Sequence, residues 1–132
     1  MSYDLSSPVG QFKFGNAGWT NLLILANQHG WEPQGTVVPA HRGSNWAGNY
    51  LSNDGQVVSE HDARMLGLAL ERSLDDIPDQ DVTAHKIKPV EGFTGLHVDD
   101  DISPVEYFSG ANSKTYLREF IVFCKTGEFR IT

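Results

Sequence analysis

Cysteine is nearly absent from the 132-residue sequence, because Cys124 is its only copy. A single thiol forms no intrachain disulfide and cannot supply the paired thiolates of a cysteine-based zinc site. Cys124 lies in an apolar helical pattern, where a buried structural thiol is expected rather than a nucleophile. A chain without disulfides is typical of a reducing compartment.

Long apolar runs are also lacking. None approaches the roughly 20 residues that are needed to cross a bilayer. The amino-terminal residues show neither the basic stretch nor the apolar core of a secretory signal. We therefore expect a soluble, cytoplasmic protein.

Lysine and arginine are scarce, with 10 of them against 17 aspartates and glutamates and a net charge of −7. The closest basic pair is Lys86 and Lys88. Nucleic-acid binding normally needs clustered basic side chains that displace counterions from phosphates. An anionic membrane surface attracts the same kind of cluster. We therefore expect neither a nucleic acid nor a membrane as the partner.

The motifs of common enzymes are missing as well. The chain has no GxSxG nucleophile elbow, no phosphate-binding P-loop and no GxGxxG fingerprint, and its five histidines show no HExxH spacing. We expect no cofactor and no metal ion. Catalytic groups often meet only in the folded chain, so an enzyme stays open, although we favour a non-enzymatic role.

What the chain does contain is enough apolar residues for one globular domain over residues 1–132, with 39% hydrophobic and 11% aromatic residues. Apolar spacing of 3.6 residues predicts helices, and alternation predicts strands. The predicted helices cover about 19–29, 60–77, 103–109 and 113–126, and the predicted strands cover about 11–14, 36–38, 84–90 and 128–132. The fold class is α+β, with three or four helices packed against a small antiparallel sheet or hairpin that pairs the two terminal strands.

Helix ends are the most clearly marked features of the sequence. Gly30 suits a left-handed position after the first helix. Ser59 is placed to cap the second helix, with Asp62 three residues later, and Ser103 and Glu106 repeat this pattern further along the chain. These residues predict where three of the helices begin or end.

The segment SNDGQ, residues 52–56, resembles part of a calcium loop. With Gly55 in the sixth position of such a loop, the twelfth position falls on His61, where a bidentate glutamate is required. Asp54 followed by Gly55 instead favours a tight hairpin turn. We predict a hairpin that residues 50–51 enter and residues 57–58 leave.

Acidic residues gather in the second half of the chain, where residues 54–106 contain 13 acidic and four basic side chains. Asp75 and Asp76 fall at the predicted carboxyl end of the second helix, where the helix dipole disfavours carboxylates. Arg72 is placed to offset Asp76 through an i, i+4 contact. This pattern predicts either a solvated surface loop or an acidic face for a basic partner, formed by Asp75, Asp76, Asp79 and Asp81.

A small acidic protein of bacterial type that acts by protein–protein binding is therefore the first functional hypothesis. Its carboxylates would meet a protein partner with a basic surface, which speeds encounter and favours the right partner. An inhibitor of a basic toxin, such as an immunity protein or an antitoxin, fits this charge and size. The oligomeric state is left open.

The run HVDDD, residues 97–101, is a second concentration of charge. His97 and Asp99–Asp101 carry groups that bind metal ions. The same aspartates immediately precede the helix that Ser103 caps, where negative charge is stabilised. We favour this helix-terminal explanation, and metal binding by these four residues remains an open question.

The segment PAHRGSNWAGNY, residues 39–50, has turn-forming residues and no apolar period. Long loops in small domains are often functional. The second functional hypothesis is a small-molecule-binding protein or an enzyme that uses this segment, with His41, Arg42, Asn45, Trp46 and Tyr50 around the ligand. The alternative is that Trp46 and Tyr50 simply close the core beneath a long loop.

Overall fold

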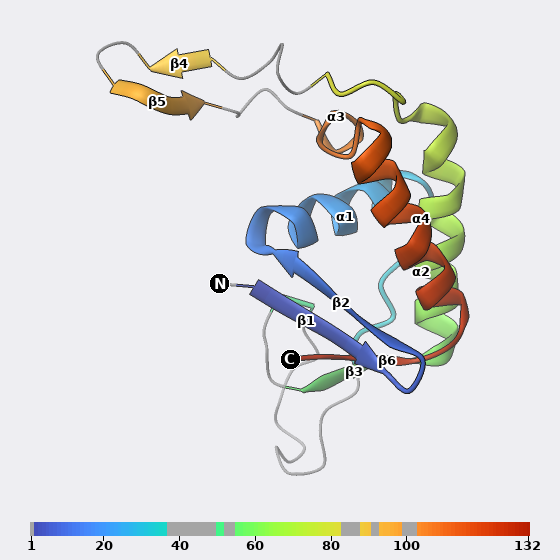
Figure 1. Ribbon diagram of the computed structural model, residues 1–132. Coiled ribbons are helices and arrows are strands. Elements are labelled where there is room, and N and C mark those ends of the chain that lie inside the picture. Colours follow the sequence, from blue (N-terminus) through green and yellow to red (C-terminus); the bar gives the residue numbers. More distant parts are fainter. Residues whose placement is uncertain (1, 37–49, 52–54, 83–87, 91–92, 99–102) are drawn as a thin grey trace.

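The computed structural model describes residues 2–36, 50–51, 55–82, 88–90, 93–98 and 103–132. Helices and strands both occur in these residues, which confirms the α+β class (Figure 1). The helices are α1 (Asn16–Gln28), α2 (Glu60–Ser73), the short α3 (Pro104–Tyr107) and α4 (Ala111–Lys125), and a 3₁₀ turn, η2 (Leu74–Asp76), extends α2. The strands are β1 (Ser2–Ser7), β2 (Gly10–Gly15), β3 (Gln56–Val58), β4 (Lys88–Val90), β5 (Phe93–Val98) and β6 (Phe129–Ile131).

Four strands form an antiparallel sheet in the order β2-β1-β6-β3, and β4 pairs with β5 in a separate hairpin. The carboxyl-terminal strand β6 therefore pairs with an amino-terminal strand, as expected. Its amino-terminal partner is β1, however, and not the predicted strand at residues 11–14, which lies within β2. Figure 1 shows α1, α2 and α4 gathered on one side of this sheet.

Aromatic side chains fill the space between the sheet and the helices. The ring of Phe120 on α4 lies 5.1 Å from the ring of Phe14 and 5.4 Å from that of Phe12, between centroids, and both partners belong to β2. Trp19 of α1 is completely buried beside them. The apolar helical pattern around Cys124 is confirmed on α4, where Cys124 is buried together with Leu117, Phe120 and Ile121. Burial raises the pKa of the Cys124 thiol, as expected for a structural cysteine.

The predicted helix ends are confirmed at three places. Gly30 has a φ of 102°, and α1 ends just before it. The Ser59 hydroxyl oxygen accepts a hydrogen bond from the Asp62 backbone N–H at 3.3 Å. Ser103 and Glu106 form the full reciprocal capping box of α3. Local capping chemistry thus sets these boundaries in the folded chain.

The predicted hairpin around residues 54–55 is wrong. Val57 and Val58 lie in β3 and pair with Arg130 and Phe129 of β6, whereas residues 50–51 form no strand. The chain from Gly55 onward is joined to β6 instead, because the Gly55 N–H donates to the Ile131 carbonyl oxygen at 2.8 Å and the Gly55 carbonyl accepts from the Arg130 guanidinium at 2.7 Å. Gly55 keeps the expected positive φ, at 81°, and residues 52–54 lie outside the described part of the chain.

Two further strand predictions are only partly matched. Of the predicted strand at residues 84–90, the structure describes residues 88–90, which form β4. Thr36, at the start of the predicted strand at 36–38, lies in no regular element, and residues 37–38 are outside the described ranges. Among the described residues, no helix combines the length and the apolarity that crossing a membrane requires.

Candidate functional site

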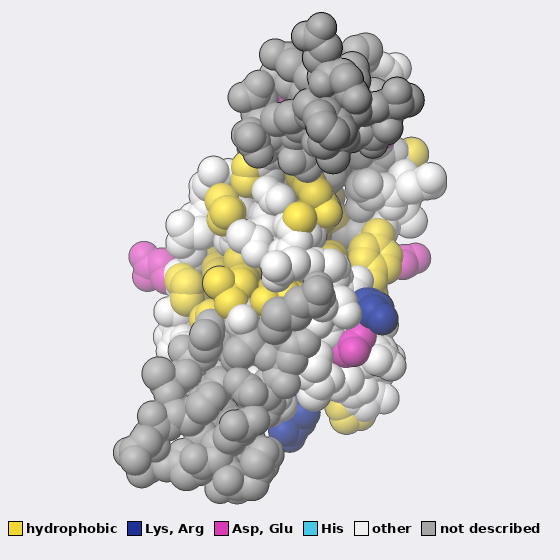
Figure 2. Space-filling model, turned by 90° about the vertical axis from the view of Figure 1, so that its left-hand side faces the viewer, with side chains coloured by type: hydrophobic (Ala, Val, Ile, Leu, Met, Phe, Trp, Pro, Cys, Tyr) yellow, Lys and Arg dark blue, Asp and Glu magenta, His cyan; other side chains and the backbone are white. Residues whose placement is uncertain are grey.

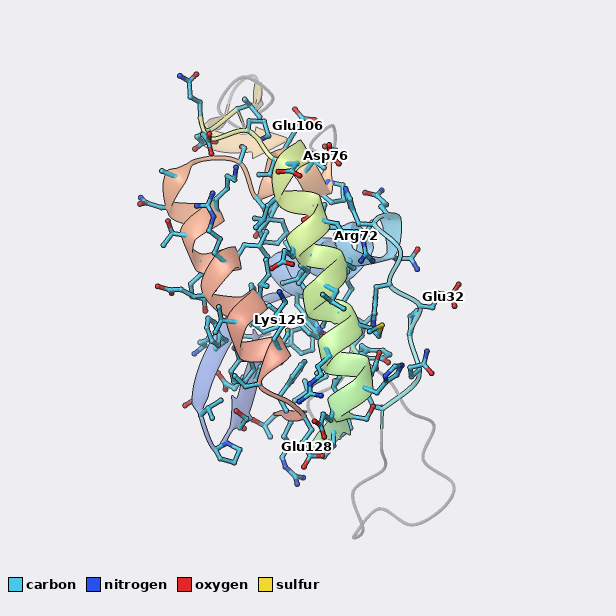
Figure 3. The ribbon with its side chains drawn as sticks, turned by 90° about the vertical axis from the view of Figure 1, so that its right-hand side faces the viewer. Glu32, Arg72, Asp76, Glu106, Lys125 and Glu128 are labelled. Carbon is cyan, nitrogen blue, oxygen red and sulfur yellow. The ribbon has the colours of Figure 1, made fainter. Side chains whose placement is uncertain are left out.

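The acidic edge is our name for Asp75, Asp76, Asp79 and Asp81, which follow α2 in the chain and are all exposed. Asp76 lies at the end of η2, near the upper end of α2 in Figure 3. Its Oδ2 is 2.8 Å from Nε2 of His29, which lies just beyond α1. Arg72, the partner expected for Asp76, instead donates from Nε to the His29 carbonyl oxygen at 2.9 Å. The prediction that Arg72 offsets Asp76 is therefore wrong, because α1 ends beside α2 and supplies other partners.

A buried lysine holds the middle of the acidic edge. Lys114 of α4 is almost completely buried, and its Nζ lies 2.8 Å from Oδ1 of Asp79. The same ammonium donates to the Ile77 carbonyl oxygen at 2.9 Å. Its hydrogen bond and charge lower the pKa of the Asp79 carboxyl. Asp79 is thus exposed at the surface while its partner is inside.

Backbone contacts fix the rest of this segment to the turn between α3 and α4. The Gly110 N–H donates to the Pro78 carbonyl oxygen at 3.1 Å, and the Val82 N–H donates to the Ser109 hydroxyl oxygen at 3.1 Å. A Cβ atom built at Gly110 would come within 3.2 Å of the Asp81 Cβ, so the two backbone segments lie close together there. The acidic edge is therefore carried on a segment that is attached to the domain along its length.

A second candidate surface surrounds the described part of the predicted ligand site. The aromatic hollow is our name for a recess of about 340 Å³ that is lined by Leu23, Ile24, Asn27, Trp31, Pro33, Tyr50 and Leu51. The rings of Trp31 and Tyr50 meet edge to face, with 5.3 Å between their centroids. Both polar side chains of the lining are engaged, because Asn27 donates to the Trp31 carbonyl oxygen at 3.0 Å and the Tyr50 hydroxyl donates to Asp62 at 2.5 Å.

Tyr50 is held at both ends. Its hydroxyl, besides donating to Asp62, accepts a hydrogen bond from the Gly35 N–H at 2.9 Å. Its backbone carbonyl accepts from the Trp19 indole N–H at 2.7 Å. Burial raises the pKa of Tyr50, and the neighbouring Asp62 carboxylate raises it further. Tyr50 therefore provides a fixed aromatic wall with a phenol that keeps its proton.

Asp62 has a second role besides its place in the predicted cap of α2. Its backbone N–H takes part in the predicted cap, but its side chain is completely buried in the first turn of α2. Oδ1 accepts from the Trp31 indole N–H at 2.9 Å, and Oδ2 accepts from the Tyr50 hydroxyl. Buried indole and phenol groups need hydrogen-bond partners, but their sequence positions do not reveal which acceptor they find.

The helix beside the hollow is uncharged, although the exposed Glu32 lies between the lining residues Trp31 and Pro33. No aspartate, glutamate, lysine or arginine occurs from Gly15 to Trp31, a stretch that includes all of α1. Ile24 and Leu51, at the rim of the hollow, are 44% and 49% exposed. Figure 2 shows several hydrophobic side chains exposed on the face that it displays. The α1 face is our name for the aromatic hollow together with Gln28, an exposed residue near the end of α1.

One member of the predicted ligand site belongs to the described part of the chain. His41, Arg42, Asn45 and Trp46 lie outside the described residues, and Tyr50 is the member that the structure describes. Asp99–Asp101 are also outside them, and His97 lies in β5. Among the described residues, no three histidine, cysteine or acidic side chains gather in a way that could hold a metal ion.

Comparisons with known proteins give no further guidance on the site. The sequence matches no family model and no curated protein, and the fold matches no solved structure.

Proposed function

We propose that the protein acts by binding another protein, and that the acidic edge meets a basic surface of this partner. The supporting observation is that four exposed carboxylates lie on a segment that is fixed to the domain by Lys114 and by backbone hydrogen bonds. A segment that is already ordered loses little conformational freedom when it binds. The negative charge of the chain would also speed the encounter with a cationic surface.

The contacts of Asp76 with the His29 ring and of Asp79 with the Lys114 ammonium leave both carboxylates accessible. The side chains of Asp76 and Asp79 are 64% and 84% exposed although each has a cationic or titratable partner. A carboxylate has two oxygens and several acceptor positions, so a second cation can reach it from the solvent side. His29 and Lys114 would then act mainly to set the direction of these carboxylates.

An inhibitor of a basic enzyme or toxin, as immunity proteins and antitoxins are, fits this proposal. Such a protein works by covering a cationic surface and needs no catalytic group of its own. The match in charge would contribute to the association rate and to the choice of partner more than to the affinity itself.

The test uses the full chain as bait in a lysate of its source cell at low salt, followed by kinetic binding measurements with the purified partner. The variant is Asp75→Asn with Asp76→Asn, and the matched control is Glu119→Gln with Glu128→Gln, which makes the same change in net charge at exposed positions elsewhere. We expect a basic partner whose association rate falls about tenfold for the first variant and changes little for the control.

Three outcomes would contradict the proposal. The lysate could yield no stoichiometric partner, the captured partner could lack a basic surface, or the control variant could weaken the complex as much as the first variant does. Thermal unfolding of each variant accompanies the measurement, so that loss of the fold is not mistaken for loss of binding.

The alternative function, small-molecule binding or catalysis around residues 39–50, has less support. Its described member, Tyr50, keeps its proton at neutral pH because burial and the adjacent Asp62 carboxylate raise its pKa. The hydroxyl is also shared between Asp62 and Gly35. Tyr50 can therefore offer an aromatic surface to a ligand, but it is poorly suited to transfer a proton.

A further inference from the structure

The four-stranded sheet ends at β2, the first strand in the order β2-β1-β6-β3. β2 pairs with β1 from Gly10 to Gly15, and no strand of the described sheet lies on its other side. The open side of an edge strand presents backbone N–H and C=O groups, onto which a strand of another molecule can pair. The β2 edge is therefore the place where this sheet could be extended.

Lys13 directs its backbone groups to this open side. Its register partner on β1 is Asp4, whose backbone N–H and carbonyl oxygen are bonded instead to Thr132, just beyond β6, at 2.9 and 2.8 Å. In an antiparallel pair, a residue turns both of its backbone groups to the same side of the strand. Lys13 therefore turns both groups away from β1, where a residue of an added strand would exchange two hydrogen bonds with it.

A tyrosine hydroxyl already occupies both of these groups. The Tyr116 hydroxyl of α4 accepts a hydrogen bond from the Lys13 N–H at 3.1 Å and donates one to the Lys13 carbonyl oxygen at 2.8 Å. One side-chain oxygen thus makes the two hydrogen bonds that a residue of a paired strand would make. The Tyr116 ring packs on Phe12 and Phe14, with 5.4 Å between the ring centroids in both contacts. This packing holds the hydroxyl at the strand edge.

We propose that Tyr116 closes the β2 edge against a further strand, so that two copies of the chain do not join their sheets there. The exposed Lys13 adds a second barrier. In a two-fold antiparallel contact centred on Lys13, the two ammonium groups lie opposite each other, and like charges in this position are destabilising. The hydroxyl occupies the backbone groups, and the charge opposes the approach. This device goes beyond the proposed function and does not involve the carboxylates of the acidic edge.

The first measurement is hydrogen exchange of the Lys13 amide in Tyr116→Phe, a variant that loses the hydroxyl and keeps the ring. Exchange should become at least about threefold faster, because the amide loses its acceptor. The matched control is Tyr107→Phe. Tyr107 lines the same recess as Lys13 and Tyr116, but the hydroxyl that is bonded to Lys13 is that of Tyr116. The control should leave the exchange of Lys13 unchanged.

The second measurement is sedimentation velocity at concentrations up to about 1 mM, which detects weak dimers. Lys13→Gln and Tyr116→Phe each keep one of the two barriers, so both should stay monomeric like the parent. The double variant that combines them should form a species of twice the 14.6 kDa chain mass, because a two-fold contact closes at two copies. Exchange of the amide at position 13 should then slow again, since the second strand supplies an acceptor. The control is Lys13→Gln combined with Tyr107→Phe, which should stay monomeric.

Four results would overturn this proposal. The first is a Lys13 amide whose exchange does not change in Tyr116→Phe, and the second is a double variant that stays monomeric at about 1 mM. The third is a control, Lys13→Gln with Tyr107→Phe, that dimerises as strongly as the double variant. The fourth is a dimer in which the amide at position 13 still exchanges fast, because its contact then lies elsewhere. All variants should keep the circular dichroism spectrum of the parent.

Discussion

The acidic edge and the α1 face are neighbours on the surface, but they differ in their charge. They meet at His29, whose ring contacts Asp76 and whose carbonyl oxygen accepts from Arg72. Across this junction the surface changes from a series of carboxylates to a helix without aspartate, glutamate, lysine or arginine. One surface presents exposed carboxylates, and the other presents an apolar recess beside an uncharged helix.

Each surface depends on one buried charged group, and the two groups have opposite signs. Lys114 is a buried cation whose carboxylate partner, Asp79, is exposed. Asp62 is a buried carboxylate whose described side-chain partners, Trp31 and Tyr50, are neutral donors. Burying a charge is costly unless hydrogen bonds compensate, and Asp62 gains further from its place in the first turn of α2. The acidic edge thus rests on an ion pair, whereas the α1 face rests on neutral hydrogen bonds to an anion.

The largest expected effect comes from Asp62→Ala. This change leaves the Trp31 indole N–H and the Tyr50 hydroxyl without their acceptor, and buried unsatisfied groups cost about 1–3 kcal/mol each. We expect the free energy of unfolding to fall by about 2–5 kcal/mol in urea denaturation. The aromatic hollow should also lose its rigid wall, which an increase in Trp31 mobility by NMR relaxation would reveal.

The control for this prediction is Asp75→Ala. Asp75 is exposed on η2, so its replacement should change stability by less than about 0.5 kcal/mol. Equal losses for the two variants would mean that the Asp62 carboxylate contributes no more than a surface charge. The comparison between a buried and an exposed aspartate would then fail.

Much of the helical structure could be predicted because its signals are local. Gly30 and Ser59 mark helix ends through backbone conformation and capping, and both act within a few residues of their own positions. The strands were harder to predict because their partners are distant. β1 pairs with β6 more than a hundred residues away, and its sequence SYDLSS carries few of the residues that favour strands. The same distant strand, β6, also pairs with β3, for which the sequence predicts a local hairpin instead.

The candidate sites show the same division. The acidic edge could be located from its composition, but nothing near Asp76 and Asp79 in the sequence indicates His29 and Lys114 as their partners. The sequence indicates only a capping role for Asp62, since residues 31 and 50 approach its carboxylate only through the fold. Charge patterns can thus be read along the chain, whereas the contacts that position them cannot.

An intermediate effect is expected from Lys114→Met, which keeps the length and apolar stem of the side chain. The Ile77 carbonyl oxygen loses its buried ammonium donor, and this loss should cost about 1–3 kcal/mol of unfolding free energy. The segment that carries the acidic edge should also detach more easily. Faster hydrogen exchange at the Val82 amide, which bonds to Ser109, would report this detachment.

Lys125→Met is the matched control for Lys114→Met, since both lysines lie on α4 and both pair with a carboxylate. Lys125 bonds to Glu71 at the surface, so its loss should cost less than about 1 kcal/mol and leave Val82 exchange unchanged. A larger cost for the surface lysine would contradict the view that burial makes Lys114 important.

The smallest expected effect is the pH dependence of the melting temperature of Asp79→Asn. It also gives the clearest distinction between Asp79 and Asp62. Lys114 lowers the pKa of Asp79 in the folded chain, so the ionised carboxylate stabilises the fold above the unfolded-state pKa of about 3.9. This contribution is lost as the pH falls through the lower folded-state pKa. The melting temperature of the parent should therefore exceed that of Asp79→Asn near neutral pH, and the gap should close in strong acid. Because Asp79 is exposed, about 1 M salt should also narrow the gap at neutral pH. If the difference in melting temperature depends on neither pH nor salt, Asp79 acts through its shape and hydrogen bonds, as Asp62 does. The distinction between the two surfaces would then fail.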